Sequence, residues 1–117
     1  MENKRELGAI KEKIAASYLE TRGYSIVECN YRCKAGEVDI VARDKEYLVF
    51  VEVKYRKTAK KGYPLEAVSM QKQKRISKIA LYYMAERGLN YLPVRFDVIG
   101  ILGDDIEHIQ NAFDYIQ

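Results

Sequence analysis

The sequence predicts an α/β domain in which a mixed β-sheet is flanked by helices. Short segments rich in β-branched and aromatic residues are typical of strands, and two longer segments carry apolar residues at helical spacing. One helical segment separates two strand segments, which favours a β-helix-β crossover and therefore some parallel pairing. A chain of 117 residues suffices for one core, so we expect residues 1–117 to form one domain.

The first helix is predicted from about Lys4 to Arg22, with Gly23 as its terminator. Its expected core stripe consists of Leu7, Ile10, Ile14 and Tyr18. A second stripe is made of small residues, which permit close approach of another backbone: Gly8, Ala9, Ala15 and Ala16. Glu12 lies within this second stripe, and two placements are open. Either its carboxylate points to water, or the small-residue face covers the sheet and brings Glu12 toward acids on the strands.

A strand from Tyr24 to Arg32 precedes a predicted hairpin with arms at residues 36–42 and 47–54. Side chains alternate between the two faces of a strand, so one face of the first arm carries Glu37, Asp39 and Val41. The other face of that arm carries Val38, Ile40 and Ala42. In the second arm Glu52 and Lys54 share a face. A tight turn near residues 44–47 sets Asp39 opposite Glu52 and Glu37 opposite Lys54.

Like charges facing each other across strands repel, by about 0.2–1 kcal/mol when exposed to water. A divalent cation would remove this repulsion, and Mg²⁺ is commonly held by one or two carboxylates with carbonyls and waters. The alternative is a charge ladder that is simply solvated. Alternation alone leaves both interpretations open.

A second helix is predicted from Pro64 or Ser69 to Arg87, with Gly88 as its terminator. Its expected buried face contains Ile76, Ile79, Ala80 and Tyr83, with Lys72 one turn earlier on the same face. Two further strands are predicted at residues 94–102 and 106–109, joined by a turn. Arg95 and Asp97 share a face of the first of these strands and are expected to form an ion pair.

Positive charge is concentrated in one part of the chain. The formal net charge is +3, yet the segment from Lys54 to Lys78 holds nine Lys or Arg residues and the single acid Glu66. Such a segment suits a polyanion, although surface cations also serve solubility. The residues expected to contact nucleic acid are Arg32, Lys34, Arg56, Lys57, Lys60, Lys61, Lys72, Lys74, Arg75 and Lys78.

Other features exclude some classes of protein. No run approaches the ~20 apolar residues of a membrane span, and the first residues do not form a secretory signal, so we expect a cytoplasmic protein without a membrane partner. Cys29 and Cys33 are expected to be reduced structural thiols, because no second cysteine pair accompanies them. His108 is expected to be an edge-strand side chain rather than a catalyst.

Asp39, followed by Glu52-Val53-Lys54, resembles the PD-(D/E)xK nuclease signature, with Val38 in place of the proline. Over nearly the whole chain the sequence resembles the YraN-like family of small bacterial proteins, which is grouped with the archaeal Holliday junction resolvases. The residues that carry this likeness include Gly8, Glu12, Gly23-Tyr24, Asn30-Tyr31-Arg32, Gly36-Glu37-Val38-Asp39, Phe50 to Lys54, Gly62, Lys72, Arg75 and Arg95 to Val98. Lys11 departs from the family, which usually has glycine there, and its bulk bears on how the first helix docks.

The resemblance implies a three-layer restriction-endonuclease-like domain that hydrolyses phosphodiester bonds in branched or junction DNA. Asp39, Glu52 and the Val53 carbonyl would bind Mg²⁺, or Mn²⁺, and Glu12 would join through water or a second ion. Lys54 would hold the attacking water, and Glu37 would support Lys54 or the turn. A homodimer is expected, because a junction has two strands to cut. Two alternatives remain: a nucleic-acid-binding module without strong catalysis, and a protein-interaction domain.

Overall fold

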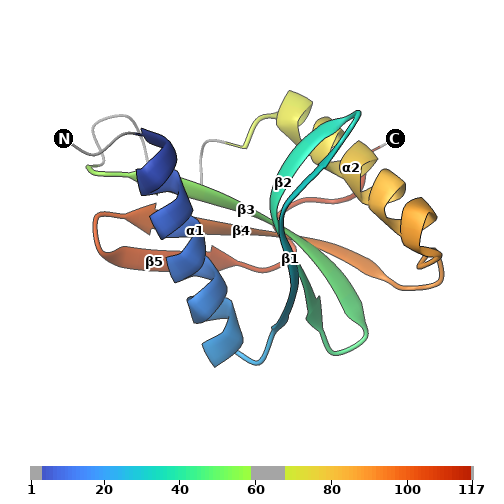
Figure 1. The fold of residues 1–117 in the computed structure, drawn as a ribbon, viewed down its shortest axis with the longest axis horizontal. Helices are drawn as coiled ribbons and strands as arrows, with labels where there is room; N and C mark the ends of the chain where they lie inside the picture. Colours follow the sequence, from blue (N-terminus) through green and yellow to red (C-terminus); the bar gives the residue numbers. More distant parts are fainter. Residues whose placement is uncertain (1–3, 59–67, 117) are drawn as a thin grey trace.

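Five strands form one mixed sheet in the order β1-β2-β3-β4-β5, with one helix on each side (Figure 1). The computed structural model describes residues 4–58 and 68–116. The elements in chain order are α1 (Lys4–Thr21), β1 (Ser25–Cys33), β2 (Gly36–Asp44), β3 (Tyr47–Arg56), α2 (Met70–Arg87), β4 (Val94–Leu102) and β5 (Asp105–Ile109). This arrangement confirms the predicted α/β class and is compatible with a three-layer restriction-endonuclease-like domain.

The crossover through α2 makes β3 and β4 parallel, while the other neighbouring strands pair antiparallel. Ser69 caps the start of α2 by accepting a hydrogen bond from the Lys72 amide at 3.2 Å. Gly88 ends the helix in a left-handed conformation with φ 65°, as predicted. The alternative start at Pro64 lies outside the described residues.

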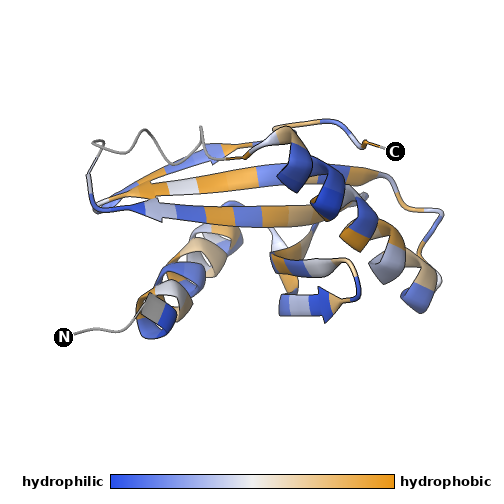
Figure 2. Cartoon of the chain, turned by 90° about the horizontal axis from the view of Figure 1, so that it is seen from above, coloured by the Kyte–Doolittle hydropathy of each residue, from blue (hydrophilic) through white to orange (hydrophobic). Residues whose placement is uncertain are grey.

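The sheet separates two apolar cores, and its strands carry much of the hydrophobic colour in Figure 2. The core beneath α2 contains the predicted buried face of that helix, packed on Phe50 and Phe96. The core beneath α1 contains Ala15 and Leu19, packed against strand residues that include Ile40, Val49, Val51 and Ile99.

The predicted core stripe of α1 is only partly right, because Tyr18 packs against the core beneath α1 but Ile10 and Ile14 do not. Ile10 and Ile14 are 49% and 37% exposed, whereas Ala15 and Leu19 are fully buried. The helix packs on the sheet through Ala15, Ala16 and Leu19, because alanines allow the two backbones to approach closely, while Gly8 and Ala9 stay exposed. With this face of α1 on the sheet, Glu12 lies toward the strands, which is the second of the two placements left open by the sequence. Lys11 is accommodated with its Nζ 4.4 Å from the centre of the Tyr55 ring, a cation–π contact.

The outer half of β2 separates from β3. The ladder between them runs from Asp44 paired with Tyr47 to Ile40 paired with Val51, in the predicted register. Past Ile40 the β1–β2 hairpin rises toward α2, and its end is drawn in cyan in Figure 1. Strict alternation therefore fails at Val38, which was expected on the face opposite Val41. The bend places Val38 in the core beneath α2 together with Val41.

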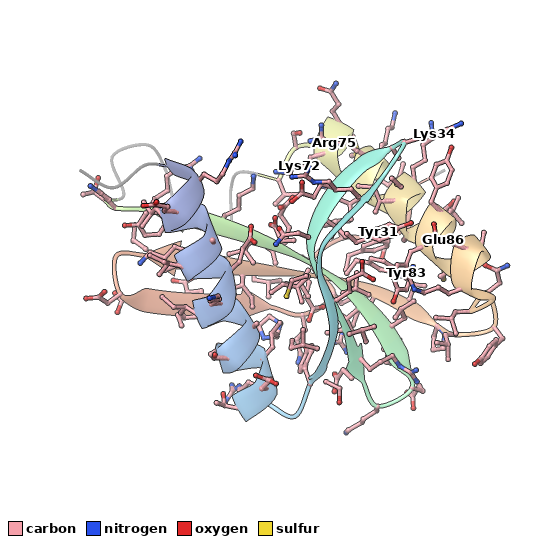
Figure 3. All side chains as sticks on the ribbon, viewed as in Figure 1. Tyr31, Lys34, Lys72, Arg75, Tyr83 and Glu86 are labelled. Atoms are coloured by element: carbon pink, nitrogen blue, oxygen red, sulfur yellow. The ribbon has the colours of Figure 1, made fainter. Side chains whose placement is uncertain are left out.

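Aromatic and charged contacts hold this hairpin against α2. The rings of Tyr31 and Tyr83 meet edge to face with centroids 5.0 Å apart, and Tyr31 donates a hydrogen bond to Glu86 (Figure 3). Arg87 stacks over Tyr83 and forms an ion pair with Glu28 at 2.7 Å. These contacts fix the position of the β1–β2 hairpin relative to α2.

Two further observations concern the cysteines and the helices. Cys29 and Cys33 are free thiols. Within the described part of the chain, neither helix has the length and hydropathy needed to cross a bilayer.

Candidate active site

The ladder between β2 and β3 ends at the pair of Ile40 and Val51, and the region beyond it, here called the fork, contains Glu37 and Asp39 of β2 and Glu52, Val53 and Lys54 of β3. Asp39 Oδ2 accepts a hydrogen bond from the Val53 amide at 2.7 Å. The aspartate side chain thus takes the amide proton that a β2 carbonyl would accept if the ladder continued. The N–H and C=O of one strand residue point to the same side, so the Val53 carbonyl also faces the fork.

Asp39 and Glu52 are held against each other with little solvent around them. Glu52 is only 6% exposed. Burial, a hydrogen bond to Glu52 and the charge of Glu52 raise the pKa of Asp39 to about 9. Burial acts to raise the pKa of Glu52 as well, but the hydrogen bond from Asp39 and the charges of Lys72 and Lys54 lower it overall. The pKa values of the two acids thus move in opposite directions, as expected for neighbouring carboxyl groups of which Asp39 keeps its proton more readily than Glu52.

Two lysines complete the fork. Lys72 of α2 lies 3.0 Å from Glu52 Oε2 and is mostly shielded from solvent, so its predicted inward orientation is confirmed (Figure 3). Lys54 lies beside it, and burial together with the neighbouring Lys72 lowers the pKa of Lys54. The ammonium charges of both lysines are directed at the acid pair.

Glu12 of α1 reaches the fork from the opposite side of the sheet. Burial raises its pKa, with further contributions from the charges of Glu37 and Glu52, while interactions with Asn30 and Asp39 oppose the rise. It lines an open depression of about 450 Å³ with neighbours that include Arg5, Gly8, Asn30, Arg32 and Glu37. Glu12 of α1 is therefore close enough to acids of β2 and β3 for their charges to affect its pKa. These acids are Glu37, Asp39 and Glu52.

Sequence reasoning missed Asn30 as a member of this site. It has a positive φ of 56° within β1 and presents its side chain to Glu12. Asparagine tolerates this conformation better than most residues, which is the one signal that the sequence offered.

Of the two placements expected for Glu37, beside Lys54 or at the turn, the structure shows the one at the turn. Its carboxylate accepts a hydrogen bond from Arg32 Nε at 2.8 Å across the β1–β2 pair. Its charge is thus directed to the hairpin turn and not to Lys54. Arg32 is correspondingly engaged, although its side chain is 79% exposed.

The remaining predicted nucleic-acid contacts fall into three groups. Those with exposed side chains are Lys34, Lys57, Lys74, Arg75 and Lys78. Arg56 is half-buried, and its Nη1 donates to the Tyr55 carbonyl at 3.0 Å. Lys60 and Lys61 lie outside the described residues.

The fork has the donor chemistry of a hard-cation site. Between residues 4 and 58 and between 68 and 116, no group of three His, Cys, Asp or Glu side chains is arranged to hold an ion. Asp39 and Glu52, together with the Val53 carbonyl, nevertheless supply the set of oxygens that Mg²⁺ uses when waters fill its other positions. A carboxylate pair in which Asp39 holds its proton more tightly than usual also fits a cation that would take the proton's place.

A second buried acid, Asp97 of β4, is surrounded by donors. Its carboxylate accepts a hydrogen bond from Arg95 at 3.0 Å, which is the predicted ion pair. It also accepts hydrogen bonds from the Tyr24 hydroxyl at 2.8 Å and the Asn111 amide at 3.0 Å. His108 Nε2 lies 2.8 Å from the same carboxylate, so His108 is part of this network. Although burial acts in the other direction, His108, Arg95 and the other donors lower the pKa of Asp97 to about 2.

The comparison with known proteins gives one family. Residues 11–101 match the model described as "Uncharacterised protein family UPF0102". A UPF0102 protein of Lachnoclostridium phytofermentans is 52% identical over 113 residues, which cover 96% of each chain. One from Clostridioides difficile is 48% identical over 95% of this chain and 99% of its own. One from Geobacter sulfurreducens is 52% identical over 92% and 88%. With matches that span the fork and both helices, this chain belongs to the UPF0102 family.

Proposed function

We propose that the chain is a metal-dependent endonuclease that hydrolyses phosphodiester bonds in branched DNA, with the fork as its catalytic site. The observation that carries this proposal is the pair of buried Glu52 and half-buried Asp39, with Lys54 and Lys72 beside it. A strongly perturbed acid pair in an opening is costly for folding and is characteristic of functional sites.

The proposed chemistry assigns a role to each group. Asp39, Glu52 and the Val53 carbonyl would hold Mg²⁺ or Mn²⁺, with Glu12 joining through water, and the ion would supply Lewis acidity toward the phosphoryl oxygen. Lys54, whose pKa burial lowers, orients the attacking water by hydrogen bonding and adds positive charge where the phosphoryl group becomes more negative. Lys72 now neutralises Glu52, and an incoming phosphate gives its ammonium group a second anionic partner.

The substrate is selected by shape under this proposal. The exposed cations on α2 contact phosphates, which bind DNA without reading its sequence. Helix α2 packs its apolar face on the sheet, so its exposed cations face outward beside the fork. A two-fold dimer would place two forks on the two strands of a junction.

Labelled four-way junctions, flaps and plain duplexes test the proposal, each with Mg²⁺, Mn²⁺ or EDTA. We expect cleavage of a branched substrate that requires a divalent ion. Asp39→Asn and Lys54→Met should each lower the rate at least about 100-fold, the scale for loss of one group that stabilises the transition state. Binding in EDTA should persist. The exposed residues Glu46 and Lys13 provide matched controls, Glu46→Gln and Lys13→Met, which should cleave normally.

The ion pair between Lys72 and Glu52 favours a second candidate, a nucleic-acid-binding module without cleavage. In that case the lysine is a permanent neutralising partner of the acid. DNA binding that weakens with salt, with no cleavage of any substrate in Mg²⁺ or Mn²⁺, would select this candidate. If DNA and RNA both fail to bind at low salt, the protein-interaction alternative is left.

A further inference from the structure

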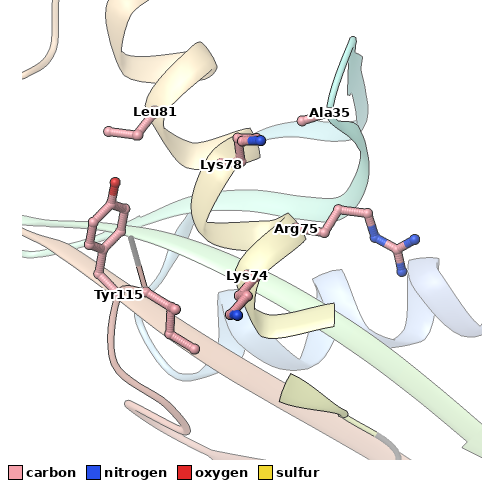
Figure 4. Close-up of a pocket in the computed structure, with 7 residues that line it drawn as sticks. Ala35, Lys74, Arg75, Lys78, Leu81 and Tyr115 are labelled. Atoms are coloured by element: carbon pink, nitrogen blue, oxygen red, sulfur yellow. The ribbon is translucent and has the colours of Figure 1, made fainter. Parts of the chain in front are cut away.

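A second opening lies on the outer side of α2 and shares no lining residue with the fork (Figure 4). Its volume is about 380 Å³, within the range of small-molecule sites, roughly 300–1,000 Å³. One part of its wall consists of the cations Lys74, Arg75 and Lys78. Another part is apolar and comes from Leu81 and from the C-terminal residues Tyr115 and Ile116.

The apolar part of the wall distinguishes this opening from a simple phosphate-binding patch. Leu81 and Tyr115 are 45% and 41% exposed, so a large ring and a branched side chain are presented to solvent beside three cations. A nucleotide combines a flat base with a negatively charged phosphate. Bases stack on aromatic side chains in a manner that tolerates any sequence, while cations hold the adjoining phosphate.

The cations of α2 connect this opening to the fork. Lys72 contacts Glu52 in the fork, and Arg75 and Lys78 follow it at successive i,i+3 positions, which are neighbours on a helix surface. The aliphatic part of Arg75 also packs against the hairpin, where a Cβ added to Gly36 would lie 3.1 Å from Arg75 Cδ. From Lys72 to Lys78 the helix rises about 9 Å, a span of two to three stacked nucleotides at about 3.4 Å each.

We propose that this opening binds one unpaired nucleotide of the DNA strand that passes the fork, with its base on Tyr115 and its phosphate on Lys74 and Lys78. This inference rests on the proposed function, because that function is what identifies the bound strand as DNA. It narrows the substrate class to branched DNA with a single-stranded tail, since the bases of an intact duplex are stacked and are not free to enter.

The chain contains no tryptophan, so Tyr115→Trp introduces a single reporter at the opening. In metal-free buffer we expect saturable quenching by dAMP, and much weaker quenching by inorganic phosphate or deoxyribose 5-phosphate. Lys74→Ala combined with Lys78→Ala should weaken the dAMP response at least about tenfold. Tyr91→Trp is the matched control, because Tyr91 is 77% exposed and is not part of the wall.

A native-sequence measurement accompanies the reporter. In EDTA, Tyr115→Ala should weaken binding to a DNA flap at least about fivefold and leave binding to plain duplex unchanged, since base stacking contributes about 1–3 kcal/mol. Tyr82→Ala, on the outer side of α2, is the control. Equal quenching by phosphate and dAMP, or an equal loss of affinity for flap and duplex, would overturn the inference. Because neither measurement requires cleavage, failure here leaves the endonuclease proposal standing, and loss of cleavage leaves this inference standing.

Discussion

Asp97 on β4 and Asp39 on β2 both direct their carboxylates away from bulk solvent, in different parts of the same sheet. Asp97 is fully buried and accepts hydrogen bonds from Arg95, Tyr24 and the Asn111 amide, with His108 also in contact. Asp39 accepts one hydrogen bond from a backbone amide, that of Val53, and its other neighbour is the acid Glu52. The pKa is about 2 for Asp97 and about 9 for Asp39.

The ionised Asp97 therefore stabilises the folded state, whereas an ionised Asp39 would destabilise it. The charge of Asp97 is matched by fixed donors, so ionisation favours the folded state. The charge of Asp39 is opposed by Glu52, so the folded state keeps a proton that the unfolded chain releases. Strain of this kind persists at functional sites, where a ligand relieves it.

The same substitution at the two positions should therefore have opposite effects on stability. Asp97→Asn should lower the free energy of unfolding by about 3 kcal/mol, because it removes the charge that Arg95 and the other donors surround and leaves Arg95 with Asp44, 2.9 Å away, as its remaining carboxylate partner. Urea denaturation followed by circular dichroism measures this change. A loss below about 0.5 kcal/mol would show that the Asp97 network is not a stabilising element.

Acid should weaken the wild-type protein through Asp97. Its pKa in the folded state lies below the unfolded value of 3.8, so its stabilisation is complete above about pH 4 and is lost as the pH falls toward 2. We expect this group to account for about 2 kcal/mol of that loss. Urea denaturation between pH 2 and 5 tests this, and Asp97→Asn should flatten that part of the profile. An unchanged profile in the variant would assign acid sensitivity to other carboxyl groups.

Asp39→Asn should raise stability in the absence of metal. The pKa of Asp39 is raised in the folded state, so wild-type stability declines as the pH rises from about 4 to about 9, and asparagine removes this dependence. The gain should reach about 1 kcal/mol or more at pH 8 and vanish near pH 4. Parallel urea denaturation at the two pH values measures it. A variant less stable than the wild type at pH 8 would contradict the raised pKa of Asp39.

Arg32→Ala should change stability by less than about 0.5 kcal/mol, because the ion pair of Arg32 with Glu37 is largely exposed. Glu37 and Asp97 each pair with an arginine, so the difference in their effect on stability measures the contribution of burial. Thermal unfolding at low and high salt is sufficient to measure the effect. A loss above about 1 kcal/mol would mean that the hairpin depends on this pair for its position.

Much of the fold follows from local patterns in the sequence. Ser69 and Gly88 mark the ends of α2, and the spacing from Lys72 to Ile76 places the lysine on the buried face. The turn after Asp44 sets the register that brings Asp39 close to Glu52. These features depend on neighbours along the chain, which is why periodicity and capping predict them.

Features that depend on distant contacts were not predictable. Helix α1 has two stripes able to pack, and only the shape of the sheet selects Ala15 and Leu19 over Ile10 and Ile14. The bend that moves Val38 to the other core accompanies the hydrogen bond between Asp39 and the Val53 amide, a contact between two strands that no local pattern encodes. The contact of His108 with Asp97 requires the pairing of β5 with β4.

Direct binding of a divalent ion tests the central claim that the fork is a cation site. Mn²⁺ binding, followed by electron paramagnetic resonance, should show a specific site in the wild type and in the control Glu46→Gln. Asp39→Asn, folded and more stable, should bind Mn²⁺ at least about tenfold more weakly. If the wild type binds no Mn²⁺ at this site, or if Asp39→Asn binds it equally well, the acid pair of the fork does not hold a metal ion.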